Sequence, residues 1–275
     1  MMDALTSRLT LNNGTAIPRL GIGTWRAPSG IVTEEAVLHA LRRGYRHIDT
    51  AAVYGNERDV GNALRKSGVP REDVFLTTKL WNDDMRGNRQ MQAFEESLER
   101  LGTDYVDLYL IHWPVEHFEQ SWKVLEEIYA SGRSRAIGVS NFKKHHLEAL
   151  LQTASVVPAV DQMEFSPYMQ DTEALAFCRE LGIVYEAWSP LGAGHYVNDP
   201  VFTEIGRKYG KTAAQVILRW VLQQDIVVFP KSVHAERIDE NANLFDFFLT
   251  EDEMKRISSL NRMLRTGSDP DTFTF

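Results

Sequence analysis

The sequence predicts an α/β fold, a (β/α)8 barrel of the TIM type whose bottom is closed by an N-terminal β-hairpin. Two observations favour this architecture. Eight short apolar runs alternate with stretches that carry apolar residues at helical spacing, a pattern typical of a parallel sheet. The 275 residues, 43% of them hydrophobic, suffice for one large core, and no linker rich in Pro, Gly and Ser divides them. We therefore expect one domain over residues 1–275.

The first element is an expected hairpin over residues 9–18, in which alternating apolar residues surround Asn13 and Gly14. Both residues tolerate the positive φ angles of a two-residue hairpin turn. Helices are expected between the barrel strands, and the first of them begins at a cap formed by Thr33 and ends at Gly44. The barrel strands are expected at residues 20–24, 45–48, 74–78, 106–111, 135–139, 159–162, 183–188 and 226–230.

An open dinucleotide-binding sheet is the main alternative, because Gly21 and Gly23 lie at the end of the first expected strand. Such a turn requires a third glycine for close packing of strand and helix, and this chain has Arg26 there. Asp49 would fit the later acidic residue of that fold, but a strand end that enters a loop is the simpler interpretation. We therefore expect the barrel.

The composition excludes several classes of partner. A net charge of -8 and a pI near 5.5 argue against nucleic acid and against an anionic membrane. No stretch has the apolar length of a signal peptide or a transmembrane helix. Cys178 is the only cysteine, so an internal disulfide and a Cys-rich metal site are excluded, and we expect its thiol to be buried and inert. These features predict a monomeric cytoplasmic protein.

Polar or indole side chains stand at the carboxyl ends of the expected strands, and in a barrel these ends meet at one mouth. Polar residues are common at any surface, so the informative feature is that neighbouring strand ends complement one another chemically. The groups are Thr24-Trp25, Asp49, Lys79, His112-Trp113, Ser140-Asn141, Gln162, Trp188-Ser189 and Lys231-Ser232.

Asp49, Tyr54 and Lys79 have the chemistry of a proton-donating group. Asp49 and Lys79 end neighbouring strands, so we expect them to pair, and Tyr54 follows Asp49 in the same loop. A free phenol has a pKa of about 10. We expect the Lys79 ammonium to lower the pKa of Tyr54 toward neutrality, which would make the phenol a useful general acid.

His112 ends the next strand. A single histidine at an apolar strand end is more often structural, but an imidazole beside a phenol can donate a hydrogen bond to a carbonyl oxygen. No Ser or Cys stands in a nucleophile elbow. His145 and His146 are adjacent, so we expect them to point in different directions and to form no metal site. A proton donor without a nucleophile or a metal requires an organic cofactor.

The runs around these four residues resemble the catalytic tetrad of the aldo-keto reductases. The resemblance spans the chain from the hairpin to residues 269–273 and is greatest to the bacterial 2,5-diketo-D-gluconate reductases and glyoxal or methylglyoxal reductases. It implies NADPH-dependent reduction of aldehydes and ketones, in which Tyr54 donates the proton and His112 orients the substrate. Lys79 and Asp49 would adjust the pKa of Tyr54. The matching runs are Ile48-Asp49-Thr50-Ala51, Tyr54-Gly55-Asn56-Glu57, Thr78-Lys79-Leu80-Trp81-Asn82 and Leu110-Ile111-His112-Trp113-Pro114.

The resemblance also implies a site for NADPH or NADP+. Ser140, Asn141 and Gln162 would bind the nicotinamide carboxamide, and Trp188 would stack on the ring. Residues 189–192 would lie along the pyrophosphate, where a glycine permits close approach.

At the end of the last strand, Lys231, Ser232 and Arg237 would bind the 2′-phosphate, and Glu240 and Asn241 the adenine. The expected cofactor-binding residues are Gly23, Thr24, Trp25, Asp49, Ser140, Asn141, Gln162, Trp188, Ser189, Pro190, Leu191, Gly192, Lys231, Ser232, Val233, Arg237, Glu240 and Asn241.

Trp25, Trp81 and Trp113 follow neighbouring strands and are expected to bind the substrate together with Tyr54 and His112. An aromatic wall favours a small or flat carbonyl compound, such as a small aldehyde, keto ester or keto sugar. A second function is possible on this fold, that of an NADPH-binding sensor or regulatory protein with little turnover. The chain departs from the family pattern at Asp161, where the family often has Asn, and at Phe165-Ser166, where it often has His.

Overall fold

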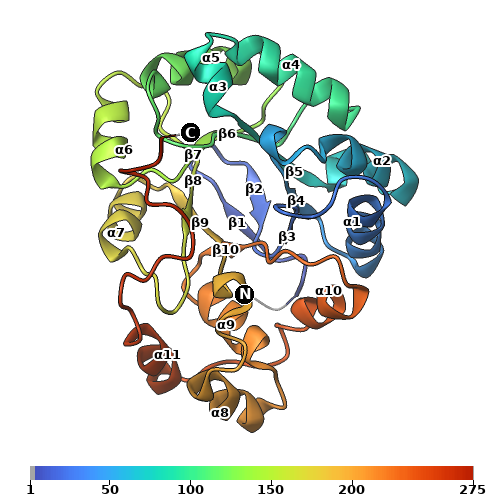
Figure 1. Cartoon of the computed structure of the whole chain (residues 1–275), viewed down its shortest axis with the longest axis vertical. Coiled ribbons are helices and arrows are strands. Elements are labelled where there is room, and N and C mark those ends of the chain that lie inside the picture. Colours follow the sequence, from blue (N-terminus) through green and yellow to red (C-terminus); the bar gives the residue numbers. More distant parts are fainter. Residues whose placement is uncertain (1–3, 275) are drawn as a thin grey trace.

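The computed structural model describes residues 4–274, so the predicted domain limits at residues 1 and 275 lie outside the described part of the chain. Eight parallel strands form the barrel, as predicted (Figure 1). Strand order in the sheet follows chain order from β3 to β10, and two bridges, Leu20 to Val228 and Gly23 to Lys231, join the first strand to the last. The strands are β3 (Ile22–Gly23), β4 (His47–Asp49), β5 (Phe75–Leu80), β6 (Leu108–Ile111), β7 (Ile137–Ser140), β8 (Val160–Glu164), β9 (Val184–Trp188) and β10 (Val227–Val228).

The helices surround the strands (Figure 1). The first helix begins at Ile31 rather than at the predicted Thr33 cap. The Thr33 hydroxyl donates to the carbonyl of Pro28 (2.6 Å) instead of capping the helix. Gly44 ends the helix with a positive φ of 108°, as predicted. The α-helices are α1 (Ile31–Arg43), α2 (Glu57–Ser67), α3 (Asn82–Arg86), α4 (Gln90–Leu101), α5 (Phe118–Ala130), α6 (Lys144–Leu151), α7 (Thr172–Glu180), α8 (Pro200–Tyr209), α9 (Ala213–Leu222), α10 (Ala235–Ala242) and α11 (Glu251–Ser258).

The N-terminal hairpin closes the bottom of the barrel, which confirms the prediction. Its strands, β1 (Arg8–Thr10) and β2 (Ala16–Pro18), pair in antiparallel register around Asn13-Gly14. Leu11 and Ile17 are buried in one cluster with residues from β5, β6, β8 and β10. The hairpin therefore caps an apolar layer inside the barrel and leaves the opposite, carboxyl end of the strands for the site.

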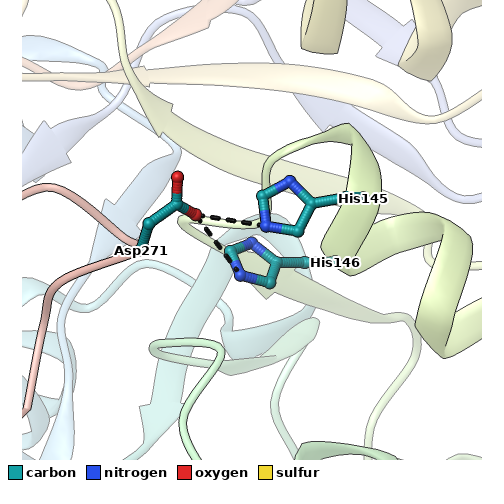
Figure 2. A group of neighbouring side chains, drawn as sticks. All are labelled: His145, His146 and Asp271. Atoms are coloured by element: carbon teal, nitrogen blue, oxygen red, sulfur yellow. Dashed lines mark ion pairs between the residues drawn. The ribbon is translucent and has the colours of Figure 1, made fainter.

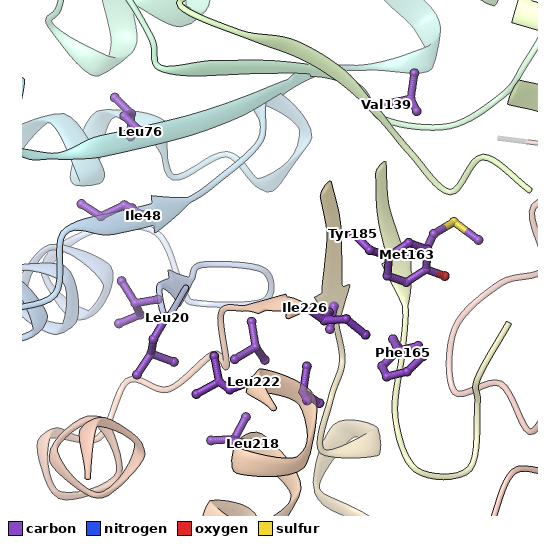
Figure 3. Close-up of a cluster of buried hydrophobic side chains, with 14 of the residues drawn as sticks. Leu20, Ile48, Leu76, Val139, Met163, Phe165, Tyr185, Leu218, Leu222 and Ile226 are labelled. Atoms are coloured by element: carbon purple, nitrogen blue, oxygen red, sulfur yellow. The ribbon is translucent and has the colours of Figure 1, made fainter. Parts of the chain in front are cut away.

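The main apolar core lies between the strands and the helices. Figure 3 shows Leu218 and Leu222 of α9 near Leu20 and Ile226, with Ile48 and Leu76 on the next strands. Burying a side chain of this size stabilises the fold by about 1.5 to 3 kcal/mol. Among residues 4–274, no helix combines the length and apolar character needed to cross a membrane.

The interior of the barrel changes from apolar to polar toward its mouth. His47, Asp49, Lys79, Gln162 and Glu186 are all buried there, on four strands. Because buried polar groups are costly without partners, their mutual contacts determine which of them are charged. These contacts form the base of the site.

Candidate active site

Asp49, Tyr54 and Lys79 meet at the mouth of the barrel, as predicted. Asp49 ends β4, Lys79 lies on the neighbouring strand β5, and Tyr54 ends a short 3-10 helix, η1 (Ala52–Tyr54), directly after β4. Lys79 Nζ donates to Asp49 Oδ1 (2.7 Å) and Oδ2 (2.9 Å), to the Thr50 carbonyl (2.9 Å) and to the Tyr54 hydroxyl (3.4 Å). One ammonium therefore connects the carboxylate to the phenol.

Lys79 carries a positive charge in this pocket. Burial alone would lower the pKa of its ammonium, but Asp49 and then Tyr54 oppose this effect, and the net shift of the pKa is upward. The Asp49 carboxyl has a raised pKa because of burial, which Lys79 and a hydrogen bond from Gln162 counteract. An ion pair with several hydrogen bonds is the arrangement in which two buried charges are tolerated.

The predicted fall in the pKa of Tyr54 is wrong. Burial raises the pKa of the phenol above its usual value of 10.0, and the opposing effect of the Lys79 charge does not reverse this shift. The Lys79 charge does lower the pKa of the phenol, but the loss of solvent around the phenol raises it by more. Tyr54 therefore keeps its proton at neutral pH, and the neutral phenol is the form that can donate a proton to a carbonyl oxygen.

His112 lies beside Tyr54 and is neutral. The two ring centroids are 5.7 Å apart in an edge-to-face arrangement. Burial and the Lys79 charge lower the pKa of His112 well below its usual value of 6.5. Its Nδ1 has no hydrogen-bond partner among residues 4–274. A neutral imidazole and a neutral phenol thus face the same small region, which supports the functional interpretation of His112 over the structural one.

The residues predicted to hold the nicotinamide form one connected group. Asn141, held at a positive φ of 67°, donates to the His112 carbonyl (3.0 Å) and accepts from Trp188 Nε1 (2.9 Å). The Ser140 hydroxyl donates to the backbone carbonyl of Gln162 (2.9 Å). The Gln162 amide nitrogen donates to Asp49 Oδ2 (2.8 Å). These contacts orient the side chains, and they link the predicted cofactor residues directly to Asp49, the partner of Lys79.

The stretch Ser189, Pro190, Leu191 and Gly192 follows β9 and lies against the C-terminal tail. The Ser189 hydroxyl bonds with the Thr266 hydroxyl (3.2 Å), and a Cβ on Gly192 would approach the Tyr196 ring to 2.1 Å. Tyr196 is buried, whereas its neighbour His195 is exposed. Gly192 is therefore required for packing of the loop, a role that the sequence did not indicate.

The predicted 2′-phosphate residues gather after β10. Lys231 and Arg237 are exposed cations, and neither has an acidic partner among the described residues. Partial burial of the ammonium lowers the pKa of Lys231, and no neighbouring carboxylate opposes the shift. The Ser232 hydroxyl accepts from the His234 backbone N–H (3.1 Å), directly before α10, which has no side-chain cap. The remaining predicted residues here are Val233, partly buried, Glu240, which accepts from Thr212 (2.6 Å), and Asn241, buried.

Gly23, Thr24 and Trp25 lie across the barrel seam from Lys231. Gly23 pairs with Lys231, and a Cβ on this glycine would meet the Phe229 carbonyl at 2.7 Å. The Thr24 hydroxyl donates to the Asp49 carbonyl (3.1 Å). Trp25 is 42% exposed, with the Arg26 guanidinium 4.3 Å from its ring centroid. The Thr24 hydroxyl is thus already hydrogen-bonded within the protein, whereas the Trp25 side chain is exposed at the surface.

The predicted substrate wall is aromatic, and it includes a residue that the sequence did not reveal. Trp81 lies edge-on to His112 (5.2 Å between centroids), and Trp113 follows His112. Phe273 of the C-terminal tail stacks on Trp113 with centroids 3.9 Å apart and planes 7° apart. Phe273 was missed because no local pattern predicts where a tail folds; its proximity depends on contacts with α6.

The prediction that His145 and His146 point apart is wrong. Asp271 Oδ1 lies 3.2 Å from His145 Nε2 and 3.6 Å from His146 Nε2 (Figure 2). These groups could serve as metal ligands, but Lys143 Nζ already bonds Asp271 Oδ2 (2.6 Å), and the Lys143 backbone N–H donates to His146 Nδ1 (3.2 Å). Both interactions oppose a metal bound through Asp271 and His146 Nε2. We interpret Lys143, His145, His146 and Asp271 as a latch, a set of contacts that holds the C-terminal tail against the start of α6.

Asp161 lies outside the group that surrounds Lys79. Its carboxyl is fully buried beside Cys178 (3.8 Å from Oδ2 to Sγ), and burial raises its pKa well above 3.8, which favours the protonated form. A protonated carboxyl has the hydrogen-bonding groups of the asparagine often found in the family at this position. Cys178 is buried, as predicted, and burial raises the pKa of its thiol.

Comparison with known proteins agrees with this geometry. Residues 19–262 match the profile of the Aldo/keto reductase family. The chain is 46% identical to the glyoxal reductase of Bacillus subtilis over 276 residues, with both chains covered completely. A putative 2,5-diketo-D-gluconic acid reductase B superposes with a TM-score of 0.88 at 42% identity, over 95% of this chain and 92% of that one. A Bombyx mori aldo-keto reductase in complex with NADP gives a TM-score of 0.90 at 34% identity, over 98% and 97%. The chain therefore belongs to the aldo/keto reductase family, as the sequence predicted.

Proposed function

We propose that this protein is an NADPH-dependent reductase of small aldehydes and ketones, in which Tyr54 protonates the carbonyl oxygen. The observation that carries the proposal is the position of Lys79 Nζ, 2.7 Å from Asp49 and 3.4 Å from the Tyr54 hydroxyl, beside a neutral His112. The chemistry at this point is proton donation to an oxygen that gains electron density during reduction.

The cofactor supplies the hydride when bound, and the protein supplies the proton and the orientation. Tyr54 donates its phenolic proton as the carbonyl oxygen becomes negative. Lys79 stabilises the phenolate that remains, because its ammonium already contacts the hydroxyl. His112 donates a hydrogen bond to the same oxygen and so fixes the carbonyl carbon in place. Asp49 keeps Lys79 charged throughout.

The residues after β10 fit a phosphorylated nicotinamide cofactor. Lys231 and Arg237 have no acidic partner within residues 4–274, although the chain as a whole carries an excess of acidic groups. Two such cations beside the Ser232 hydroxyl suit a dianionic phosphate. Two hydrogen bonds support placement of the nicotinamide at the mouth. Trp188 donates to Asn141, and Gln162 donates to Asp49. The similar Bombyx mori enzyme was solved with NADP.

The substrate class follows from the aromatic wall. Trp81, Trp113 and Phe273 crowd the space next to His112, which suits a short or flat carbonyl compound such as a glyoxal, a keto ester or a keto sugar. The similarity to a glyoxal reductase supports the smallest of these as the first to test. A monomeric cytoplasmic enzyme is the form we propose, to be checked by light scattering and cell fractionation.

The decisive experiment measures the loss of NADPH absorbance with glyoxal, methylglyoxal and a panel of aromatic aldehydes. We expect turnover with at least one of them, and strong loss of turnover in Tyr54→Phe. No finding favours the sensor alternative. Tight NADPH binding without turnover of any compound in the panel would support that alternative and contradict the reductase.

A further inference from the structure

Gln162 lies between two acidic side chains. Its amide nitrogen donates to Asp49 Oδ2 (2.8 Å) on one side and to Glu186 Oε2 (2.8 Å) on the other. All three residues are buried, with 2% or less of their surface exposed. Both N–H bonds of this amide are therefore used inside the protein, and within residues 4–274 its side-chain oxygen accepts no hydrogen bond.

The orientation of the amide follows from the charge of Asp49. A carboxylate paired with Lys79 can only accept hydrogen bonds, so the nitrogen of Gln162, not its oxygen, must face Asp49. Asp49 alone would leave the second N–H without a partner and the amide plane less constrained. Glu186 Oε2 supplies that second acceptor from the neighbouring strand β9, in register with Gln162 on β8.

Glu186 has no other polar partner of comparable strength. Its Oε1 lies 3.9 Å from His47 Nε2 and makes no hydrogen bond among the described residues. His47 is neutral, because burial lowers its pKa to about 3, so it offers no countercharge. Burial also raises the pKa of Glu186 to about 8, and its carboxyl is therefore mainly neutral at pH 7. An uncharged acid in this place acts as a hydrogen-bonding group, not as a source of charge.

We propose that Glu186 is a positioning residue for recognition of the nicotinamide: together with Asp49 it occupies both N–H groups of Gln162, so that the carbonyl oxygen of Gln162 is offered to the amino group of the carboxamide. The proposal rests on the function proposed above, in which Gln162 binds the nicotinamide. It adds a residue that the sequence resemblance did not include, and it explains a buried acid that donates no proton in the reaction.

If the Gln162 oxygen accepts from the carboxamide amino group, the protein should prefer NADPH to an analogue that lacks this group. This preference can be measured. The reduced 3-acetylpyridine analogue of NADPH has a methyl group in place of the carboxamide amino group, so it cannot donate to an acceptor oxygen. One net hydrogen bond corresponds to a preference for NADPH of about three- to tenfold in Kd. Because both cofactors share the remaining contacts, their Kd ratio reports the amide contact and is insensitive to a general loss of stability.

The experiment is fluorescence titration of both cofactors against the wild type, Glu186→Met, Glu186→Gln and Gln162→Met. We expect the wild type to prefer NADPH, Glu186→Met and Gln162→Met to lose most of that preference, and Glu186→Gln to keep it, since a glutamine retains a neutral acceptor oxygen of the same shape. Glu186→Ala serves as a second acceptor-free variant in case Glu186→Met does not fold, which circular dichroism will show.

Two results would overturn the proposal. One is an unchanged Kd ratio in Glu186→Met or Glu186→Ala. The other is a wild type that reduces methylglyoxal but binds the two cofactors equally, which would leave the reductase function intact and remove Gln162 as the group that recognises the carboxamide. Failure of the reductase function has a separate signature, the absence of turnover with every carbonyl compound.

Discussion

Lys79 Nζ lies 2.7 Å from Asp49 Oδ1, and the two side chains form a buried ion pair at the base of the active site. The same ammonium reaches the Tyr54 hydroxyl at 3.4 Å. The pair therefore satisfies two buried charges, and it places a cation beside the phenol that we propose as the proton donor.

Replacing Lys79 with Met leaves Asp49 buried without its counter-ion, and we expect a loss of about 3 to 5 kcal/mol in the free energy of unfolding. Urea denaturation measures this quantity. The matched control is the double variant Lys79→Met with Asp49→Asn, which removes both charges and should recover part of the stability. Equal stability of the single and double variants would show that the pair is not coupled.

Replacing Tyr54 with Phe removes the proton donor and keeps the ring. We expect kcat to fall by about 100-fold or more, because general acid catalysis contributes this much, while the Kd of NADPH stays within twofold. Stopped-flow or steady-state absorbance gives kcat, and fluorescence gives Kd. Retention of full activity would mean that another group donates the proton, with His112 the first to examine.

Lys231→Ala and Arg237→Ala should each weaken NADPH binding by about tenfold and leave NADH binding nearly unchanged, because only NADPH carries the 2′-phosphate. Fluorescence titration of both cofactors provides the measurement. Lys255→Ala, an exposed cation on α11, is the control and should affect neither cofactor. If Lys231 and Arg237 weaken both cofactors equally, the phosphate site lies elsewhere.

Lys143→Ala removes the ammonium that bonds both Asp269 (2.6 Å) and Asp271 (2.6 Å) and so loosens the tail that carries Phe273. We expect KM for the carbonyl substrate to rise about two- to fivefold, with an unchanged Kd for NADPH. Within residues 4–274, the neighbouring Lys144 forms one ion pair, with Glu173 (3.2 Å), so Lys144→Ala is the matched control. A KM equal to that of the control variant would argue against a role for the latch in substrate binding.

Glu186 should make stability depend on pH. The folded protein holds the Glu186 proton up to about pH 8, whereas an unfolded chain releases it near the usual value of 4.5. The stabilisation from this group is therefore complete below pH 4.5 and is lost as the pH rises toward 8. Relative to wild type, Glu186→Gln should gain up to about 1.4 kcal/mol of unfolding free energy per pH unit in that window.

Urea denaturation of both proteins at pH 5, 6, 7 and 8 isolates this effect, since all other groups titrate alike in the two. A difference in stability that is constant with pH would show that Glu186 does not change its proton affinity on folding.

Sequence patterns predicted the barrel and the hairpin, and they predicted that Asp49, Tyr54, Lys79 and His112 lie together at the mouth. The reason is that alternating strands and helices bring strand ends to one mouth, so residues such as Asp49 and Lys79 are placed by strand order alone. The proposed cofactor residues after β10 came from the resemblance of that short stretch of the chain to the family. The barrel, the hairpin and the order of the strand ends depend on local sequence pattern and on topology, and both can be predicted from the sequence.

The charge states of the buried groups, and the partners that each of them contacts, depend on the tertiary structure. The pKa of Tyr54 rises instead of falling because the surrounding side chains exclude solvent, and solvent exclusion is not a property of any local motif. Three further contacts likewise join residues that are distant in the sequence. Asp271 lies close to both His145 and His146, Phe273 stacks on Trp113, and Glu186 accepts a hydrogen bond from Gln162. Strand order brings the ends of β4 and β5 together, but distances of 2.8 Å within the barrel depend on how every side chain packs.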